Sequence, residues 1–143
     1  MSSATGSGER TCQVVRKGIE HGGHYGASYV LGVTAETVGA KGLSLSAATL
    51  PPGARTKAHV HEHESAFYVI SGEGDLYFGE QMEHREHVQA GNFFYVPDGV
   101  AHIFVNASQT DPAVFIGGRT DPNMQEAFTP RPDLDPLVPA DAS

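Results

Sequence analysis

The sequence predicts an all-β fold, built as a single domain of many short strands. Val, Phe and Tyr occur in short runs, and 17 glycines and 9 prolines punctuate the 143 residues. This composition is typical of strands joined by tight turns, and almost no stretch carries the long amphipathic period of a helix. The length suits one domain with a single sizeable core.

The two ends of the chain differ in composition from its middle. Residues 1–10, MSSATGSGER, are small, polar and rich in glycine, so we expect a flexible arm there. Residues 11–119 carry the strand-like stretches and predict one all-β domain. Residues 120–143 hold five of the nine prolines. Because proline cannot donate to a sheet, this tail is expected to wrap the surface in extended form, with partial disorder as the alternative.

Short apolar and β-branched stretches predict the strands of this domain. We expect them at residues 11–15, 29–33, 43–50, 58–61, 65–70, 75–78, 92–96, 102–106 and 113–117. The sequence SGEG at 71–74 predicts a tight hairpin turn. Two stretches, GIEHGGHYG at 18–26 and GEQMEHREH at 79–87, predict exposed loops because they are rich in glycine or charge.

Charge and hydropathy exclude several classes of partner. The formal net charge is −8 and no Lys/Arg cluster occurs, so we expect neither nucleic acid nor membrane as a partner. No apolar run approaches the roughly 20 residues of a membrane span, and the start lacks the apolar core of a signal peptide. One cysteine, Cys12, excludes an internal disulfide framework. We expect a cytoplasmic protein that binds a small organic molecule.

Three histidines alternate along one predicted strand. His59, His61 and His63 stand two residues apart, and residues two apart in a strand point to the same face. Two imidazoles on one face can share a metal ion. A straight strand separates His59 from His63 by about 13 Å, so His63 can join the same ion only if the chain bends. A later segment, GNFFYVPDGVAHIFVN at 91–106, brings His102 behind a Pro-x-Gly turn.

These two segments carry the motifs of a known superfamily. Gly53, five residues, His59-x-His61 and the run to Gly72 resemble the first cupin motif, G(x)5HxH(x)3-4E(x)6G. Residues 91–106 match the second cupin motif, G(x)5PxG(x)2H(x)3N, at every defined position. The chain therefore resembles the single-domain cupins. The resemblance implies a jelly-roll β-barrel of two antiparallel sheets that holds a divalent metal ion.

The resemblance also implies a metal centre, which is the expected catalytic centre. Its ligands map onto His59, His61 and His102. The family's glutamate ligand falls on Ser65, whose hydroxyl is a poor ligand at neutral pH. Two residues of the expected bend can supply a fourth ligand instead: His63, which we favour, or Glu64. Water is the remaining alternative.

The expected cofactor is one divalent transition metal ion. Four neutral imidazoles suit zinc, nickel, copper or iron(II) better than magnesium or calcium. Zinc is the first expectation, with nickel, iron or manganese as alternatives. Without a carboxylate ligand the site keeps the full +2 charge of the ion, which favours a Lewis acid over a redox centre.

Apolar residues are expected to surround the metal ion. The predicted substrate pocket combines Tyr77 with residues that share the metal-facing parity on two strands. Its members are Ser65, Phe67, Val69, Tyr77, Phe104 and Asn106. Such a pocket suits a flat, largely apolar ligand. Arg55, Lys57 and Arg119 are expected at the solvated surface, and the alternative is that they meet a carboxylate or phosphate at the mouth of the pocket.

The first functional hypothesis is a metal-dependent enzyme acting on a small-molecule aromatic or poly-β-ketone substrate. Beyond the two motifs, the chain is similar to the cupin-type aromatic polyketide cyclases of actinomycetes, of the resistomycin-pathway type, which act in antibiotic biosynthesis. The resemblance implies an aldol-type ring closure with the metal ion as Lewis acid.

Three other functions stay open on the sequence alone. One is a non-haem metal dioxygenase of the quercetinase type, and another is a non-catalytic cupin that binds or senses a small molecule. A sugar isomerase or epimerase would need more charged groups inside the barrel. Cupins that resemble this chain commonly pair through sheet edges, so a homodimer is expected.

Overall fold

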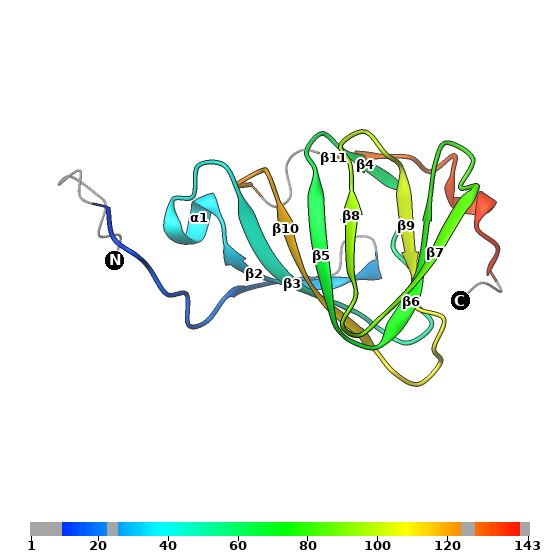
Figure 1. Cartoon of the computed structure of the whole chain (residues 1–143), viewed down its shortest axis with the longest axis horizontal. Coiled ribbons are helices and arrows are strands. Elements are labelled where there is room, and N and C mark those ends of the chain that lie inside the picture. The colour runs from blue at the N-terminus through cyan, green and yellow to red at the C-terminus, as the bar shows by residue number, and fades with distance from the viewer. Residues whose placement is uncertain (1–9, 23–25, 124–127, 141–143) are drawn as a thin grey trace.

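The protein, described by a computed structural model, consists of two antiparallel sheets that face each other and enclose a barrel (Figure 1). The structure describes residues 10–22, 26–123 and 128–140. One sheet has six strands in the order β1-β2-β3-β10-β5-β8, and the other has five in the order β11-β4-β9-β6-β7. The predicted all-β jelly roll is confirmed.

The described elements are short and follow one another closely. The six-stranded sheet contains β1 (Ile19–His21), β2 (Ser28–Val33), β3 (Ser44–Leu50), β5 (Ser65–Ser71), β8 (Phe93–Val96) and β10 (Ala113–Arg119). The five-stranded sheet contains β4 (His59–His61), β6 (Glu73–Phe78), β7 (His84–Gln89), β9 (His102–Val105) and β11 (Phe128–Pro130). One helix, α1 (Ala35–Val38), and one 3-10 turn, η2 (Asp135–Leu137), accompany them. No helix in the described ranges has the length and hydropathy that crossing a bilayer requires.

The first predicted strand is wrong in its position. Residues 11–15 form no strand, whereas β1 lies in the segment 18–26 that was predicted to be a loop. This strand pairs with β2, with Ile19 opposite Leu31. It has three residues at the edge of a sheet, too few to produce a periodic pattern. Part of the segment, residues 23–25, lies outside the described residues.

The predicted hairpin at 71–74 is instead a corner between the two sheets. β5 ends at Ser71 and β6 begins at Glu73, and the two strands belong to different sheets. Gly72 makes this step with φ 81°, a left-handed conformation that favours glycine. A Cβ atom there would also meet the backbone of Pro112. The chain therefore crosses from one sheet to the other at a single glycine.

The predicted loop at 79–87 is wrong in its second half, because β7 begins at His84. This strand pairs with β6, from Phe78 opposite His84 to the other end of both strands. Its polar side chains bind the carboxylate of Asp75 on β6: His87 Nδ1 lies 2.9 Å and Arg85 Nη2 lies 3.3 Å from its oxygens. An edge strand held by charged groups shows no alternation of apolar and polar residues, so the sequence pattern did not predict it.

The C-terminal segment covers the outside of the five-stranded sheet. Ile103 and Val105 of β9 point away from the barrel and pack in an apolar cluster with Leu134 and Val138. Arg55 fixes this segment by donating to the carbonyl oxygen of Val138 at 2.8 Å. The tail was expected to wrap the surface, and here it completes a second apolar core beside β9 and β4 (Figure 1).

The outer face of the six-stranded sheet is apolar and exposed. One row of residues in register crosses five strands, and we call it the apolar row. It consists of Val30, Ala47, Ile116, Tyr68 and Phe93. The ring centroids of Tyr68 and Phe93 lie 4.8 Å apart, and Phe93 is 78% exposed. Exposed apolar patches of this kind mark contact surfaces on folded proteins.

Asn106, expected in the substrate pocket, fixes the loops at one end of the barrel. Its side chain is fully buried. The amide nitrogen donates to the carbonyl oxygens of Leu50 at 3.1 Å, Pro51 at 3.2 Å and Asp111 at 2.8 Å. Its Oδ1 accepts from the backbone N–H of Ser108 at 3.0 Å. This asparagine of the second motif therefore has a structural role.

We predict that Asn106→Ala lowers the free energy of unfolding by about 2 to 4 kcal/mol, because it leaves several buried backbone groups without a partner. Urea unfolding followed by circular dichroism measures this loss. Asn123→Ala is the matched control, since Asn123 is exposed. Equal stability of the two variants would contradict the structural role.

Candidate metal centre

Strand pairing brings the histidines of the two motifs together. His59 on β4 lies directly opposite His102 on β9, and this pair is where the two strands meet in register. His61 follows His59 by two residues and therefore points to the same face. The turn before β9 is tied to the same strand, because the Gly99 N–H donates to the His61 carbonyl oxygen at 2.9 Å. Gly99 has φ 78°, which explains the glycine of the Pro-x-Gly turn.

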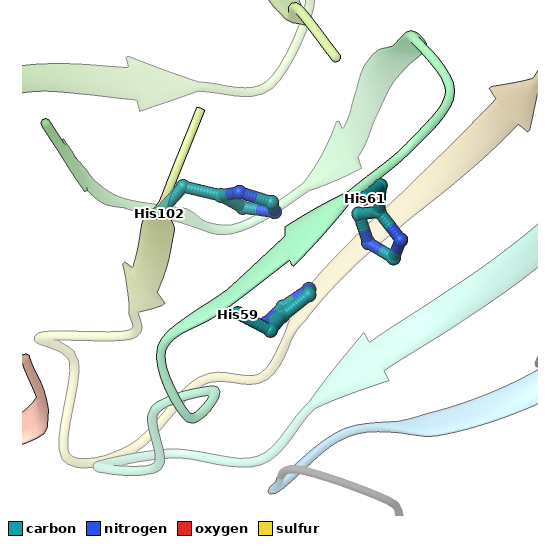
Figure 2. Close-up of side chains that lie close together, drawn as sticks. All are labelled: His59, His61 and His102. Carbon is teal, nitrogen blue, oxygen red and sulfur yellow. The ribbon is translucent and has the colours of Figure 1, made fainter. Parts of the chain in front are cut away.

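The three imidazoles converge on one space inside the barrel. One ring nitrogen of each histidine lies within 4.8 Å of the others. The ring centroids lie 4.4 Å apart for His59 and His102, 4.7 Å for His59 and His61, and 5.6 Å for His61 and His102. Figure 2 shows the three rings reaching toward one another from their two strands. We call these residues the histidine trio.

Backbone carbonyl groups fix the orientation of two rings. Nδ1 of His59 lies 2.7 Å from the carbonyl oxygen of Lys57, and Nδ1 of His102 lies 3.0 Å from that of Val100. Because a carbonyl oxygen only accepts, each Nδ1 carries the proton and donates it. The lone pair is therefore on Nε2 in both rings. A backbone partner of this kind is common behind histidines that bind metal ions.

The buried environment keeps His59 and His102 uncharged. Burial lowers the pKa of His102 to about 3, and the neighbouring His59 adds to this effect. Burial also lowers the pKa of His59, against an opposing contribution from the hydrogen bond to Lys57. Neutral imidazoles have a free lone pair at neutral pH, which metal binding requires.

Ser65 and Arg119 occupy the place where the family motif has its carboxylate ligand. Ser65 is buried on β5, and its Oγ accepts from Nε of Arg119 at 3.2 Å. Nη2 of the same guanidinium lies 3.3 Å from Nε2 of His61. Arg119 was expected at the solvated surface, and this expectation is wrong. Its position at the end of β10, opposite Ser65, turns the side chain into the barrel.

Neither candidate for the fourth ligand lies in the trio. His63 Nδ1 is 3.6 Å from a carboxylate oxygen of Asp121. Glu64 accepts a hydrogen bond from the exposed Tyr95 hydroxyl at 2.8 Å. The expected bend follows β4, and the group of ring nitrogens that lie within 4.8 Å of one another includes neither side chain. His63 as a metal ligand stays a prediction.

A cavity opens beside the trio and is mostly apolar. Its lining includes Phe67 and Phe104, as predicted, together with the trio and Arg119. The other lining residues are Tyr29, Ser46, Ala48, Thr56, Leu76, Phe94, Phe115, Gly117 and Gly118. The space in it that the centres of water molecules can occupy is about 60 Å³. One water needs about 10 to 15 Å³ on this measure, so the cavity has room for about four to six waters or one aromatic ring.

Four of the predicted pocket residues lie outside this lining. Val69 faces the interior but is fully buried in the packed core, and Ser65 is bound by Arg119. Tyr77 lies on the other side of β6, where it packs under the C-terminal segment and beside the guanidinium of Arg85. Its neighbour Leu76 faces the cavity instead. The pleat of β6 decides this, since adjacent residues point to opposite faces.

Sequence reasoning missed several lining residues for a common reason. Tyr29 and Phe115 stand on β2 and β10, outside the two motifs. Phe94 stands in a run of three aromatic residues, where parity alone does not show which one points inward. Burial raises the pKa of Tyr29, so its hydroxyl keeps its proton and can donate a hydrogen bond. Had the pairing of the strands been known, it would have shown that all three side chains point into the barrel.

The trio fits a divalent transition metal ion. Its donors are neutral nitrogen atoms, which suit zinc, copper, nickel or iron better than magnesium or calcium. Ligand atoms around such an ion lie about 3 to 3.5 Å apart, given metal–nitrogen bonds of about 2.0 to 2.1 Å. The nitrogens of the trio lie within 4.8 Å, so ring movements of about 1 Å bring them to this spacing.

Comparison with known proteins agrees with the motifs and the geometry. Residues 47–117 match a family model described as a cupin domain. This chain contains a cupin domain. The match covers both histidine-bearing strands and the whole of the barrel between β3 and β10. No significant match was found among curated proteins.

Solved structures with the same fold include bacterial oxalate decarboxylases. The Lactobacillus farciminis enzyme in complex with formate has a TM-score of 0.66 and 17% identity over 79% of this chain and 33% of its own. The Bacillus subtilis enzyme at pH 4.6 has a TM-score of 0.69 and 19% identity over 82% and 31%. A further structure, from work on the Mn(II) centres of the B. subtilis enzyme, has a TM-score of 0.63 and 23% identity over 80% and 30%.

These similarities show the fold of the cupin domain. This chain spans about a third of the length of the oxalate decarboxylases, whose covered shares are 33%, 31% and 30%. At least one of these neighbours holds manganese. The three-histidine arrangement of the present chain thus occurs in a fold that serves metal-dependent enzymes.

We predict that the metal-free protein loses stability as the pH falls from about 6.5 toward 3. His102 has an ordinary pKa of 6.5 in the unfolded chain and about 3 in the folded barrel. Above pH 6.5 both states are neutral at this residue. Below it, the unfolded state binds a proton that the folded state does not, so unfolding becomes more favourable.

Urea unfolding between pH 7.5 and 4.5, with a chelator present, measures this dependence. The range extends roughly two pH units below the ordinary pKa of histidine. His102→Gln removes the titrating group. The slope of the free energy of unfolding against pH should therefore fall by the amount that corresponds to up to about one bound proton. Identical slopes for the wild type and His102→Gln would show that His102 is not buried in its neutral form.

Proposed function

We propose that this protein is a metal-dependent cupin enzyme that closes rings in a poly-β-ketone or aromatic substrate. The observation that supports the proposal is the histidine trio, which stands at the side of a cavity walled by phenylalanine rings. Phe94 stacks against Phe67 and Phe104 with interplanar angles of 15° and 8°. Flat walls of this kind suit a flat ligand.

The trio would hold one divalent ion, zinc in the first place. The ion would supply Lewis acidity toward a carbonyl oxygen of the substrate. The chain's own residues bind and orient the ketone chain: the aromatic walls restrict it to a folded conformer and keep water out. Tyr29, whose hydroxyl keeps its proton, can donate to a carbonyl or enolate oxygen that gains negative charge during the closure.

The size of the cavity limits what it can enclose. Room for about four to six waters corresponds to one ring or a short diketone segment. The remainder of a long polyketone would therefore lie at the mouth of the barrel. Ring closure of a short segment needs only the enclosed part to be correctly folded.

The activity is tested with a linear triketone of seven carbons, a size chosen to match about one aromatic ring. Ring closure converts it to a methylresorcinol with loss of one water. Zinc-loaded wild-type protein should accelerate this conversion, and His102→Ala should lower the rate by about 100-fold or more. An absence of any acceleration, combined with tight ligand binding, would identify a non-catalytic binding cupin instead.

A metal-dependent dioxygenase of the quercetinase type is the second candidate. The observation that supports it is the stacked phenylalanine wall beside three nitrogen donors, because a flat flavonol fits such a wall and these donors also suit iron or nickel. Oxygen uptake with the iron-loaded or nickel-loaded protein and a flavonol distinguishes the two reactions. The cyclase consumes no oxygen.

We predict that His61→Ala and His102→Ala weaken zinc binding by more than about 100-fold, because loss of a supporting partner alone costs 10-fold to 100-fold. Competition with a chromophoric chelator measures the affinity. His84→Ala is the control, since its side chain is 60% exposed on β7. Zinc affinities of the trio variants equal to that of the control would refute the metal centre.

The same titration decides the role of His63. Loss of affinity in His63→Ala comparable to that in His61→Ala would place His63 in the coordination sphere. Wild-type affinity would leave the fourth position to water or to the substrate. Glu64→Ala serves as the parallel test for the other candidate.

We also propose a homodimer, formed through the apolar row on the outer face of the six-stranded sheet. The five residues of the row are uncharged, whereas the chain as a whole carries a formal net charge of −8, and Glu20 of β1 lies next to Val30 at one end of the row. Two copies can therefore meet over Ala47, Ile116, Tyr68 and Phe93 without placing charged residues of the row against each other. Isologous packing of two such faces buries the same apolar residues on both subunits.

The dimer predicts that wild-type protein elutes with twice the mass of the chain. Tyr68→Glu, between Ile116 and Phe93 in the apolar row, should give a monomer because it buries an unpaired carboxylate in the interface. Light scattering during gel filtration measures the mass. Val14→Glu is the control, since Val14 is exposed elsewhere. A monomeric wild type would refute the dimer.

A further inference from the structure

A second depression opens beside the cavity, between the edges of the two sheets. β8 ends the six-stranded sheet and β7 ends the five-stranded sheet, and residues of both strands line this depression (Figure 1). We call it the side groove; its walls include Leu76 and Phe78 of β6, Glu86 and Val88 of β7, and Phe94 of β8. The space that water centres can occupy is about 600 Å³ there, against about 60 Å³ in the cavity. The side groove therefore has room for more than one ring.

Two residues belong to both the side groove and the cavity. Leu76 and Phe94 line each of the two spaces. Leu76 points inward from the five-stranded sheet, and Phe94 points inward from the six-stranded sheet and packs against the core cluster that contains Leu76. Phe94 is only half-buried. A ligand that extends beyond the cavity on this side therefore passes these two side chains and enters the side groove.

The side groove also carries a carboxylate. Glu86 lies in register opposite Leu76, and residues opposite each other on paired strands point to the same face. Arg85 and His87 alternate with Glu86 and bind Asp75 on the other face of the sheet. Glu86 is exposed, and within the described part of the chain its carboxylate forms no hydrogen bond or ion pair. It can therefore accept hydrogen bonds from a ligand.

We propose that the side groove binds the distal part of an extended aromatic ligand whose first ring occupies the cavity, and that Glu86 accepts a hydrogen bond from a hydroxyl group on that distal part. This inference rests on the proposed function, because it adds a second binding region to the same site. Phe78, Val88 and Phe94 supply the apolar contacts. The ligand class narrows to hydroxylated molecules of two or more rings, which the cavity alone cannot enclose.

The test compares three aromatic ketones, each of which adds one feature to the one before. They are acetophenone, para-acetylbiphenyl, and the same biphenyl ketone with a hydroxyl group at the far end of its second ring. Isothermal titration calorimetry on the zinc-loaded protein measures their affinities. In the wild type the second ring should raise the affinity by about 10-fold or more, because it buries apolar surface. The hydroxyl group should add about 3-fold to 10-fold.

Two variants of Glu86 separate these contributions. Glu86→Gln keeps the size of the side chain and removes its charge, so it should lose most of the gain from the hydroxyl group and keep the gain from the second ring. Glu86→Trp fills the side groove and should lose both gains, while the affinity for acetophenone stays at the wild-type value. Gln89→Trp is the matched control, since Gln89 is exposed on the other face of the same strand.

A wild type that binds the biphenyl ketone no more tightly than acetophenone overturns the inference, as does a protein that binds none of the three ketones. A Glu86→Trp variant that keeps both gains, with a normal melting temperature and zinc content, also overturns it. Should Glu86→Trp fail to fold, Glu86→Gln carries the test, and an unchanged gain from the hydroxyl group then overturns the inference.

The proposed function fails in a different assay. It fails when the zinc-loaded protein closes no ring in the linear triketone, which is short enough for the cavity alone. The ratios of the three ketone affinities then still report on the side groove, because they compare binding and require no reaction.

Discussion

The pairing of β4 with β9 is the constraint on which the rest of the site depends. It sets His59 directly opposite His102, although the two residues stand 43 positions apart in the chain. Side chains on opposite strands lie close enough for both rings to reach one ion, and His61 joins them through the two-residue repeat of β4. A shift of one residue would turn every ring to the opposite face. The register thus determines whether a metal centre exists.

The second determining feature is the exchange of a carboxylate for a serine and an arginine. A carboxylate ligand would neutralise part of the ion's charge from within the protein. Ser65 cannot do this, and the guanidinium beside it adds charge of the same sign as the metal. Asp121, outside the cavity lining, acts on the same guanidinium with the opposite charge. The charge around an ion on the trio would therefore depend on several elements of the fold, and the motif spacing does not show it.

The sequence predicted most of the fold and the three histidines that converge in the barrel, because motif spacing and strand parity are local properties. His59, His61 and His102 could be identified from spacing alone. Arg119 could not, since its role arises from the pairing of β10 with β5, which no local pattern records. Tyr77 was wrongly placed in the pocket, because the sequence does not show which residues of β6 point into the barrel. β7 was missed because its side chains pair through charge, and apolar periodicity detects only strands that are held by apolar contacts.

The C-terminal segment also determines how far the site can be separated from the rest of the chain. β11 pairs with the outer edge of β4, with Phe128 opposite His61 and Pro130 opposite His59. The strand that carries two of the three histidines is thus held between β9 and the tail, and Asp135 accepts a hydrogen bond from the N–H of Ala58 just before it. A fragment cut at the last strand of the barrel would leave β4 with one neighbour. The smallest unit able to position all three imidazoles extends into the proline-rich end.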